Sequence, residues 1–216
     1  LSGAFFRKQD TAGRKSLFMP VNRSVPDVAQ KRKDWNGLIS GFKASDLVFL
    51  DESGCNTDMT RRYAYSLGGS RAVDSAPLSK PKNTTILSSI QLDGTLRYTT
   101  FSGGTTVERF KRYLETDLLP HLNGNSVLIM DNMKSHHAKA VKNLLDSSEI
   151  RYIYLPPYSP DLNPIEKLWS KVKAFLRKFK ARTLDALPNA IQCAFQTVSP
   201  SDCSGWFHSC GYSPYF

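Results

Sequence analysis

Hydrophobic residues in this chain gather in short runs that stop abruptly at polar residues, as buried strands do. One run, "DLVFLDESG" at 46–54, ends in two acids and a glycine, and another, "SVLIMDN" at 126–132, ends at Asp131. A third run, "IRYIYLP" at 150–156, stops at proline. We expect each of the three to form a strand, the first two ending in acidic side chains.

Residues 83–104 contain two more strand-like runs, which lie on either side of Asp93-Gly94. This dipeptide favours a tight hairpin turn, because both residue types tolerate positive φ. Five strands result, with helical segments between the later ones. The order strand, hairpin, helix, strand, helix, strand, helix predicts one α/β domain with a mixed sheet.

Helical spacing of apolar residues marks the segments between these strands. In residues 105–122 the apolar positions fall on one side of a helix, and Thr105 with Glu108 predicts a capping box at its start. Further helices are expected within 29–42, 136–148, 164–182 and 183–198. The aromatic, cysteine-containing tail after residue 198 has no predicted element.

The composition indicates one core of ordinary size: 216 residues, 40% of them hydrophobic. No run of about 18 apolar residues predicts a membrane span, and the first residues contain no apolar core of a secretory signal. The four cysteines form no CxxC pair, so we expect free thiols in a reducing cytosol rather than a zinc site. Because the first residue is not Met, we expect the start of a longer protein to be missing.

The net charge of +10 is concentrated in two blocks. Residues 1–43 carry nine Lys/Arg against three acids, and residues 167–182 carry seven Lys/Arg and no acid. We interpret 1–43 as a basic arm and 44–216 as the folded domain. Two basic blocks around a mildly acidic centre suit a polyanion, although a solvated face is the ordinary alternative for either block. The candidate DNA-binding residues are Lys167, Lys171, Lys173, Arg177, Lys178 and Lys180.

Asp51 and Asp131 each follow four apolar residues, so each is expected at the carboxyl end of a strand. One such acid only shows where burial stops. Two of them on neighbouring parallel strands would crowd like charges together, which is costly unless a cation or proton intervenes. Mg²⁺ is the natural cation for paired carboxylates. Glu52 should point to the opposite face of the sheet, because successive strand residues alternate.

Glu166 has two possible roles. Asn163, Pro164 and Glu166 fit the N-cap, first and third positions of a helix, a capping arrangement that needs no other function. On the same helix, however, Glu166 lies beside the apolar stripe, in line with Lys173 and Arg177. A carboxylate there could hold a metal while the cations hold phosphates. The residues alone leave both roles open, while the nearby prolines fix the first turn of the helix in place.

Three segments together resemble the catalytic domain of DDE transposases of the mariner-like superfamily. They are "FLDESG" at 49–54, "LIMDNMKSHHAK" at 128–139 and "YSPDLNPIEKLWSKVK" at 158–173, the last being the most specific. The bacterial insertion-sequence branch looks most similar. The second and third acids are separated by 34 residues, as in Asp-Asp-Glu members, and the likeness covers about residues 14–182.

This resemblance implies a ribonuclease-H-like fold with a mixed five-stranded sheet flanked by helices. It implies two divalent metal ions, Mg²⁺ with Mn²⁺ as a substitute, held by Asp51, Asp131 and Glu166. It places Asn132 and His136 near that site. The partners it implies are transposon ends and target DNA, with the protein as a homodimer on DNA in a bacterial cytoplasm, at the nucleoid.

Two other functions fit part of the sequence. A metal-dependent phosphohydrolase for small molecules would also use strand-end aspartates, but gives no reason for two basic blocks. A transposase remnant that binds DNA without cutting it would keep the basic blocks, and the presence of all three acids argues against decay. The first 45 residues offer no helix-turn-helix, so we expect end recognition to require another segment or chain. Trp169 is interpreted as core and Asp161 as a loop or capping residue.

Overall fold

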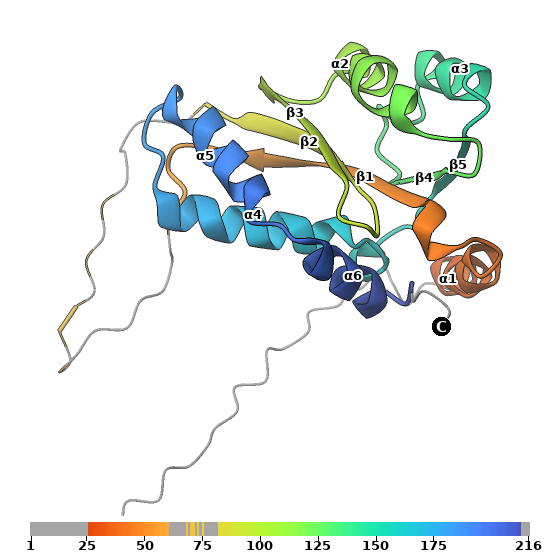
Figure 1. The fold of residues 1–216 in the computed structure, drawn as a ribbon, viewed down its shortest axis with the longest axis horizontal. Coiled ribbons are helices and arrows are strands. Elements are labelled where there is room, and N and C mark those ends of the chain that lie inside the picture. Colours follow the sequence, from red (N-terminus) through yellow and green to blue (C-terminus); the bar gives the residue numbers. More distant parts are fainter. Residues whose placement is uncertain are drawn as a thin grey trace, which may run out of the picture.

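The protein is built on one five-stranded sheet with helices on both faces (Figure 1). A computed structural model describes residues 26–60 and 82–212, together with residues 68, 70, 71, 73 and 75. The strands are β1 (Leu47–Cys55), β2 (Thr84–Ile90), β3 (Leu96–Ser102), β4 (Val127–Met130) and β5 (Arg151–Tyr154). Their order is β3-β2-β1-β4-β5, with β2 antiparallel to β1 and β3, and with β4 parallel to β1 and β5. The predicted mixed sheet is confirmed.

Two layers of helices enclose the sheet (Figure 1). One face carries α2 (Val107–Tyr113) and α3 (Lys139–Ser147), and the other carries α4 (Ile165–Phe179), α5 (Ala186–Gln196) and α6 (Pro200–Ser209). A further helix, α1 (Pro26–Ile39), lies beside the start of β1. None of the helices in the described part of the chain is both long enough and apolar enough to cross a membrane.

The alternation of side chains along β1 assigns its residues to the two layers. Phe49 belongs to the hydrophobic cluster under α4, and Leu50 belongs to the cluster under α2 and α3. Both are fully buried. Because the side-chain period of a strand is two, Asp51 follows Phe49 to the α4 face and Glu52 follows Leu50 to the other face. This is the separation of the two acids that the sequence predicted.

Both ends of the described chain pack onto the α4 face. Trp35 of α1 is buried there, and its Nε1 donates a hydrogen bond to the Tyr212 hydroxyl over 3.2 Å. The tail before Tyr212 forms α6, a helix that the sequence did not predict. Only Cys203 and Phe207 of its ten residues are buried, so no continuous apolar stripe marks it. Its start has a capping box of Ser199 with Asp202.

Two predictions for the segment 105–122 need correction. The N-cap of α2 is Thr106, not Thr105, and its hydroxyl accepts the Arg109 backbone N–H over 3.3 Å. The regular helix is also shorter than expected, since Leu114–Leu118 form a π-helical turn and Leu119–His121 a 3₁₀ turn.

The β2–β3 hairpin has a three-residue loop, from Leu92 to Gly94, which is one residue longer than the two-residue turn that Asp93-Gly94 suggested. The Gly94 N–H donates to the Gln91 carbonyl over 3.2 Å, and the Gln91 N–H donates to the Thr95 carbonyl over 3.0 Å. This is the three-residue form, in which a glycine of positive φ follows the turn. Gly94 takes that position, with φ of 92°.

We expect Gly94→Ala to destabilise the protein by about 1–3 kcal/mol in urea unfolding. Alanine disfavours positive φ, and its Cβ would lie 2.9 Å from Cα of Pro200, at the start of α6. The matched control is Gly205→Ala in α6, where a Cβ meets no atom within 4 Å. That change should stabilise the protein by about 0.5–1 kcal/mol through helix propensity. Equal stability of Gly94→Ala and the unsubstituted protein would contradict this account.

Candidate active site

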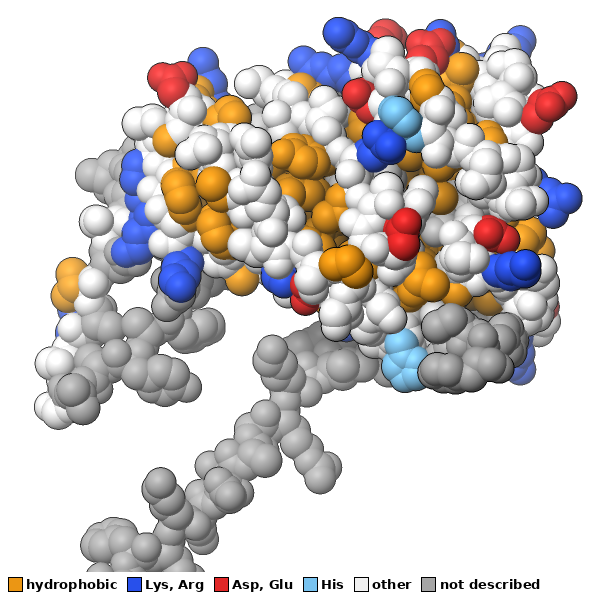
Figure 2. Space-filling model, viewed as in Figure 1, with side chains coloured by type: hydrophobic (Ala, Val, Ile, Leu, Met, Phe, Trp, Pro, Cys, Tyr) orange, Lys and Arg blue, Asp and Glu red, His pale blue; other side chains and the backbone are white. Residues whose placement is uncertain are grey.

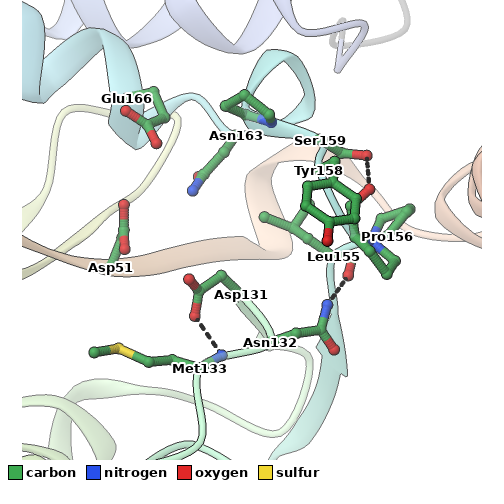
Figure 3. A pocket seen from close by; sticks show the side chains of 12 residues that line it. Asp51, Asp131, Asn132, Met133, Leu155, Pro156, Tyr158, Ser159, Asn163 and Glu166 are labelled. Atoms are coloured by element: carbon green, nitrogen blue, oxygen red, sulfur yellow. Dashed lines mark hydrogen bonds between the residues drawn. The ribbon is translucent and has the colours of Figure 1, made fainter. Parts of the chain in front are cut away.

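Parallel pairing brings the first two predicted acids together at one edge of the sheet. β1 and β4 run side by side with Leu50 opposite Met130. Asp51 and Asp131 follow this pair and therefore lie side by side where β4 ends (Figure 3). Asp131 is the first residue after β4, as predicted, whereas Asp51 does not end its strand, because β1 continues to Cys55 through its pairing with β2. Glu166 reaches this edge from the first turn of α4. The three carboxylates line one cavity of about 450 Å³.

Asp51 is the most enclosed of the three acids, with 8% of its surface exposed. Its Oδ1 accepts the Glu52 backbone N–H over 2.8 Å, and its Oδ2 accepts Nε1 of Trp169 over 3.1 Å. Burial raises the pKa of Asp51 to about 7, against the effect of these two hydrogen bonds, and the nearby charges of Glu166 and Asp131 raise it further. Without a cation, this carboxyl group is therefore reluctant to ionise.

Trp169 has a second role that sequence reasoning missed. It is a core residue, as predicted, with 3% of its surface exposed. Its indole N–H also orients Asp51. Trp169 lies three residues after Glu166, so α4 contributes two side chains to the site, Glu166 at the cavity and Trp169 beside Asp51. The spacing of one helical turn between Glu166 and Trp169 was visible in the sequence, but the direction of the indole N–H was not.

Asp131 is held by a buried histidine. Nδ1 of His136 lies 2.9 Å from Oδ1 of Asp131, and the same oxygen accepts the Met133 backbone N–H over 3.0 Å. Burial alone would raise the pKa of Asp131, but the hydrogen bond and charge of His136 outweigh it, so the pKa lies below its usual value. Asp131 thus presents its other oxygen, Oδ2, for further ligands.

His136 connects Asp131 with Glu52 on the other face of the sheet. Its Nε2 lies 3.2 Å from Oε2 of Glu52, and its ring stacks on Phe110 with the ring centres 4.2 Å apart. Burial would lower the pKa of this fully enclosed histidine, but hydrogen bonds to two carboxylates raise it to about 9. Both ring nitrogens then donate. His136 stands behind Asp131 rather than in the cavity wall, and Glu52 is a supporting residue that the sequence did not indicate.

The structure rejects the predicted cap that involved Glu166. Oδ1 of Asn163 has no hydrogen-bond partner among the described residues, and the Glu166 N–H bonds instead to the Asn163 backbone carbonyl over 3.2 Å. Glu166 lies on the exposed rim of the cavity. Partial burial raises its pKa, Lys173 opposes that effect and Asp131 adds to it. The arrangement favours the role at the cavity over the role in capping.

The proline-rich loop before α4 is fastened from outside. Arg32 of α1 donates to the Ser159 hydroxyl and forms an ion pair of 2.7 Å with Asp161. From the C-terminal tail, the Tyr212 hydroxyl donates to the Leu162 carbonyl over 2.6 Å. Asp161 thus lies within the loop, as interpreted from the sequence, in its short 3₁₀ turn Pro160–Leu162. Asn132 lines the cavity and anchors the loop through a hydrogen bond from its amide to the Leu155 carbonyl.

The predicted DNA-binding residues differ in their surroundings. Lys171 forms an ion pair of 2.6 Å with Asp202, which ties α4 to the start of α6. Lys173 lies close enough to Glu166 to lower its pKa. Lys180 ends α4 in a left-handed conformation. Lys167 and Lys178 are exposed, and Arg177 is half-buried. Lys and Arg side chains gather at the edge of the molecule where α4 ends (Figure 2).

The donors around the cavity fit a hard cation such as Mg²⁺ or Mn²⁺, which prefers carboxylate oxygens. The raised pKa of Asp51 supports this fit, because a cation in the cavity would offset the cost of burying a negative charge there. In the described part of the chain, however, no three His, Cys, Asp or Glu side chains lie close enough together to hold one metal ion. Binding would therefore draw the carboxylates closer together.

The sequence from residue 46 to residue 188 matches the family described as DDE superfamily endonuclease. This match covers more than half of the chain and contains all three acids, so the protein belongs to that family. Among its curated relatives is the Tc1 transposase of the transposable element Tc1 of Caenorhabditis elegans. It is 27% identical over 97 residues, which are 43% of this chain and 36% of the relative.

Solved structures with the same fold include three of Mos1 transposase. Its paired-end complex with the left transposon end has a TM-score of 0.76 at 18% identity, covering 91% of this chain and 62% of the Mos1 chain. The paired-end complex with Mn has a TM-score of 0.77 at 18% identity, covering 94% and 64%. The isolated catalytic domain has a TM-score of 0.65 at 16% identity, covering 88% and 95%. The predicted ribonuclease-H-like fold is confirmed.

The chain spans only part of these relatives: 36% of Tc1 transposase and 62% of the Mos1 chain in its complex with the left end. Its extent agrees with that of the isolated Mos1 catalytic domain, of which it covers 95%.

We expect Asp51→Asn to stabilise the metal-free protein at pH 8, by an amount on the order of 1–3 kcal/mol. The folded pKa of about 7 lies above the usual 3.8, so the folded state binds more protons than the unfolded state between these values. Stability therefore falls as the pH rises through this range, and the penalty is complete above pH 7. Urea unfolding from pH 4 to pH 8 should show the gain growing with pH.

Asp202→Asn is the control, for which we expect a change in stability of the opposite sign. Hydrogen bonds from Lys171 and Ser199 lower the pKa of Asp202 to about 2, so this carboxylate stabilises the fold above pH 4. Its replacement should destabilise the protein at pH 8. If both variants lose stability at pH 8, the cost of the buried charge on Asp51 is not the dominant effect.

Proposed function

We propose that this chain is the catalytic domain of a DNA transposase, which cuts DNA at transposon ends and joins the freed 3′-hydroxyl to target DNA. The observation that carries the proposal is the convergence of Asp51, Asp131 and Glu166 on one cavity. Membership of the DDE endonuclease family supports DNA cleavage. The likeness to Mos1 complexes with transposon ends supports DNA as the substrate.

Asp51, Asp131 and Glu166 would hold two Mg²⁺ ions, with Mn²⁺ able to substitute. Such a pair of ions activates the attacking oxygen and stabilises the leaving oxygen of an in-line displacement at phosphorus. Similar Mos1 structures carry Mg or Mn, which supports this choice of cation.

The surrounding side chains orient these carboxylates in advance. Trp169 and the Glu52 N–H hold Asp51, while His136 and the Met133 N–H hold one oxygen of Asp131. Partners of this kind fix the direction of a ligand and reduce the ordering required on binding. The Pro-rich loop, fastened by Arg32, keeps the first turn of α4 and hence Glu166 in place.

Both reaction steps exchange one phosphate–oxygen bond for another. In the first, a water oxygen bonds to phosphorus and the bond to the 3′-oxygen breaks, leaving a 3′-hydroxyl at the transposon end. In the second, that hydroxyl loses its proton, its oxygen bonds to a target phosphate, and the target's own 3′-oxygen leaves. No oxidant, reductant or energy-rich cofactor is needed, because the number of ester bonds is conserved in the joining step.

Lysine and arginine side chains of α4 would hold the DNA backbone beside this site, and we propose that the protein works as a homodimer on DNA. In a bacterial cell such an enzyme would act at the nucleoid. Three carboxylates would repel the phosphates of DNA. The Lys and Arg side chains of α4 would counter this repulsion, because their positive charge attracts phosphates to the acidic cavity.

We expect Asp131→Asn to reduce Mg²⁺-dependent nicking of DNA that carries the element's ends by a factor on the order of 10³. Glu166→Gln should act in the same direction, because the amide keeps the shape of the side chain but binds a cation poorly. The control is Glu115→Gln, an exposed glutamate of the α2 side that pairs with Lys111 and should leave nicking unchanged.

The outcome separates three functions. Nicking at the normal rate by Asp131→Asn would remove this residue from the chemistry. A protein that binds DNA but never cuts it, with Mg²⁺ or with Mn²⁺, would be a transposase remnant. Release of phosphate from small phosphate esters without DNA cleavage would identify a phosphohydrolase.

We expect the double change Lys173→Ala with Arg177→Ala to weaken DNA binding regardless of sequence. Each lost phosphate contact should reduce the slope of log affinity against log salt by about 1. The matched control removes one lysine and one arginine from the opposite face of the sheet, Lys111→Ala with Arg112→Ala in α2. Titrations at several salt concentrations should show an unchanged slope only for the control. An unchanged slope in both would make the α4 cations an ordinary solvated face.

A further inference from the structure

Asn163 is a buried polar residue whose side chain has no evident structural role in the described part of the fold. Only 4% of its surface is exposed, and its Oδ1 atom is sealed from solvent without a hydrogen-bond partner among the described residues. Leaving such an acceptor unpaired costs about 1–3 kcal/mol, and unpaired buried groups in native proteins call for a specific explanation.

The ordinary structural roles of this asparagine are filled by other groups. The N–H of Glu166 bonds to the Asn163 backbone carbonyl, so the side chain does not cap α4. Pro164 begins the helical backbone, with φ of −58°. The loop is fastened through Ser159, Asp161 and the Leu162 carbonyl instead. Deleting the Asn163 amide would therefore remove no contact that holds the loop.

The side chain points into the candidate active site. Asn163 lines the same cavity as the three acids. Figure 3 shows its amide nitrogen directed toward the space between Asp51, Asp131 and Glu166. The carboxylates of that cavity can only accept hydrogen bonds when ionised, whereas this amide brings N–H donors to the same space.

We propose that Asn163 contacts the substrate: its Nδ2 donates a hydrogen bond to a non-bridging oxygen of the phosphate that is cleaved. A phosphate oxygen can only accept, so the donor half of the amide is the half that recognises it. This inference rests on the proposed function, because it assumes a scissile phosphate in the cavity.

A neutral donor suits this position. Charge builds up on the non-bridging oxygens during the displacement, and a donor fixed in place before the reaction stabilises that charge without reorganisation. An aspartate at 163 would keep the shape of the side chain but bring a fourth negative charge to the cavity, which repels phosphate and attracts cations.

The test compares Asn163→Ala and Asn163→Asp with the unsubstituted chain in single-turnover cleavage, with Mn²⁺ affinity measured separately by electron paramagnetic resonance. For Asn163→Ala we expect the cleavage rate to fall by a factor on the order of 10²–10³, as for loss of one active-site donor. Mn²⁺ affinity and the thermal midpoint should stay unchanged. Asn163→Asp should cleave no better than Asn163→Ala, even if it binds Mn²⁺ more tightly. The control is Asn189→Ala, an exposed asparagine of α5, which should match the unsubstituted chain.

A modified substrate addresses the contact itself. When sulfur replaces the contacted non-bridging oxygen, the acceptor is weakened, so the effect of Asn163→Ala should shrink for one phosphorothioate stereoisomer and persist for the other. Such coupling between two changes identifies a direct interaction.

Several results would overturn the inference. Cleavage retained by Asn163→Asp together with weaker Mn²⁺ binding by Asn163→Ala would make this residue a metal ligand. Equal rates for Asn163→Ala and the unsubstituted chain, or a rate loss that follows thermal stability alone, would remove it from the site. These outcomes leave the proposed function standing. If the unsubstituted chain itself fails to cleave DNA, the proposed function fails and this inference falls with it.

Discussion

The parallel pairing of β1 with β4 is the constraint on which the rest of the site depends. It sets Asp51 and Asp131 at the same edge of the sheet, where burial first, and then the charges of Glu166 and Asp131, raise the cost of ionising Asp51. The fold does not relieve this conflict by moving the acids apart. It surrounds them with N–H donors from Trp169 and His136, and it leaves the remaining oxygens facing a cavity. A site of this kind is most stable with a cation present.

Support for the two aspartates comes from opposite faces of the sheet, and a one-residue alternation makes this possible. Asp51 turns toward α4 and meets Trp169, whereas Glu52 turns toward α2 and meets His136. Through His136, Glu52 reaches Asp131 on the next strand. The adjacent acids Asp51 and Glu52 therefore act differently. Asp51 lines the cavity, whereas Glu52 supports Asp131 through His136. Phe110 packs against this group of side chains, because its ring stacks on the ring of His136.

Segments far from the acids in sequence hold the third one in place. Glu166 lies on a helix, and the position of that helix depends on the proline-rich loop before it. Prolines stiffen the loop, but stiffness alone does not set its direction. Arg32 from the basic N-terminal region and Tyr212 from the tail fasten it to the body. Through these two residues, α1 and the described end of the tail help to position the third carboxylate.

The sequence by itself determined the order of the elements along the chain and the mixed sheet, because hydrophobic periodicity is a local property that survives without a structure. Motif spacing in the same way predicted the three acids of the candidate site. The sequence also located the basic charge on α4. Only the tertiary structure showed that Asp51 pairs with Trp169, 118 positions away, and that Arg32 pairs with Asp161, 129 positions away. It also placed α6, which buries too few residues to show an apolar stripe, and it rejected the cap at Asn163. Contacts of this kind depend on which faces meet after folding, and no local pattern encodes the direction in which a side chain will find its partner.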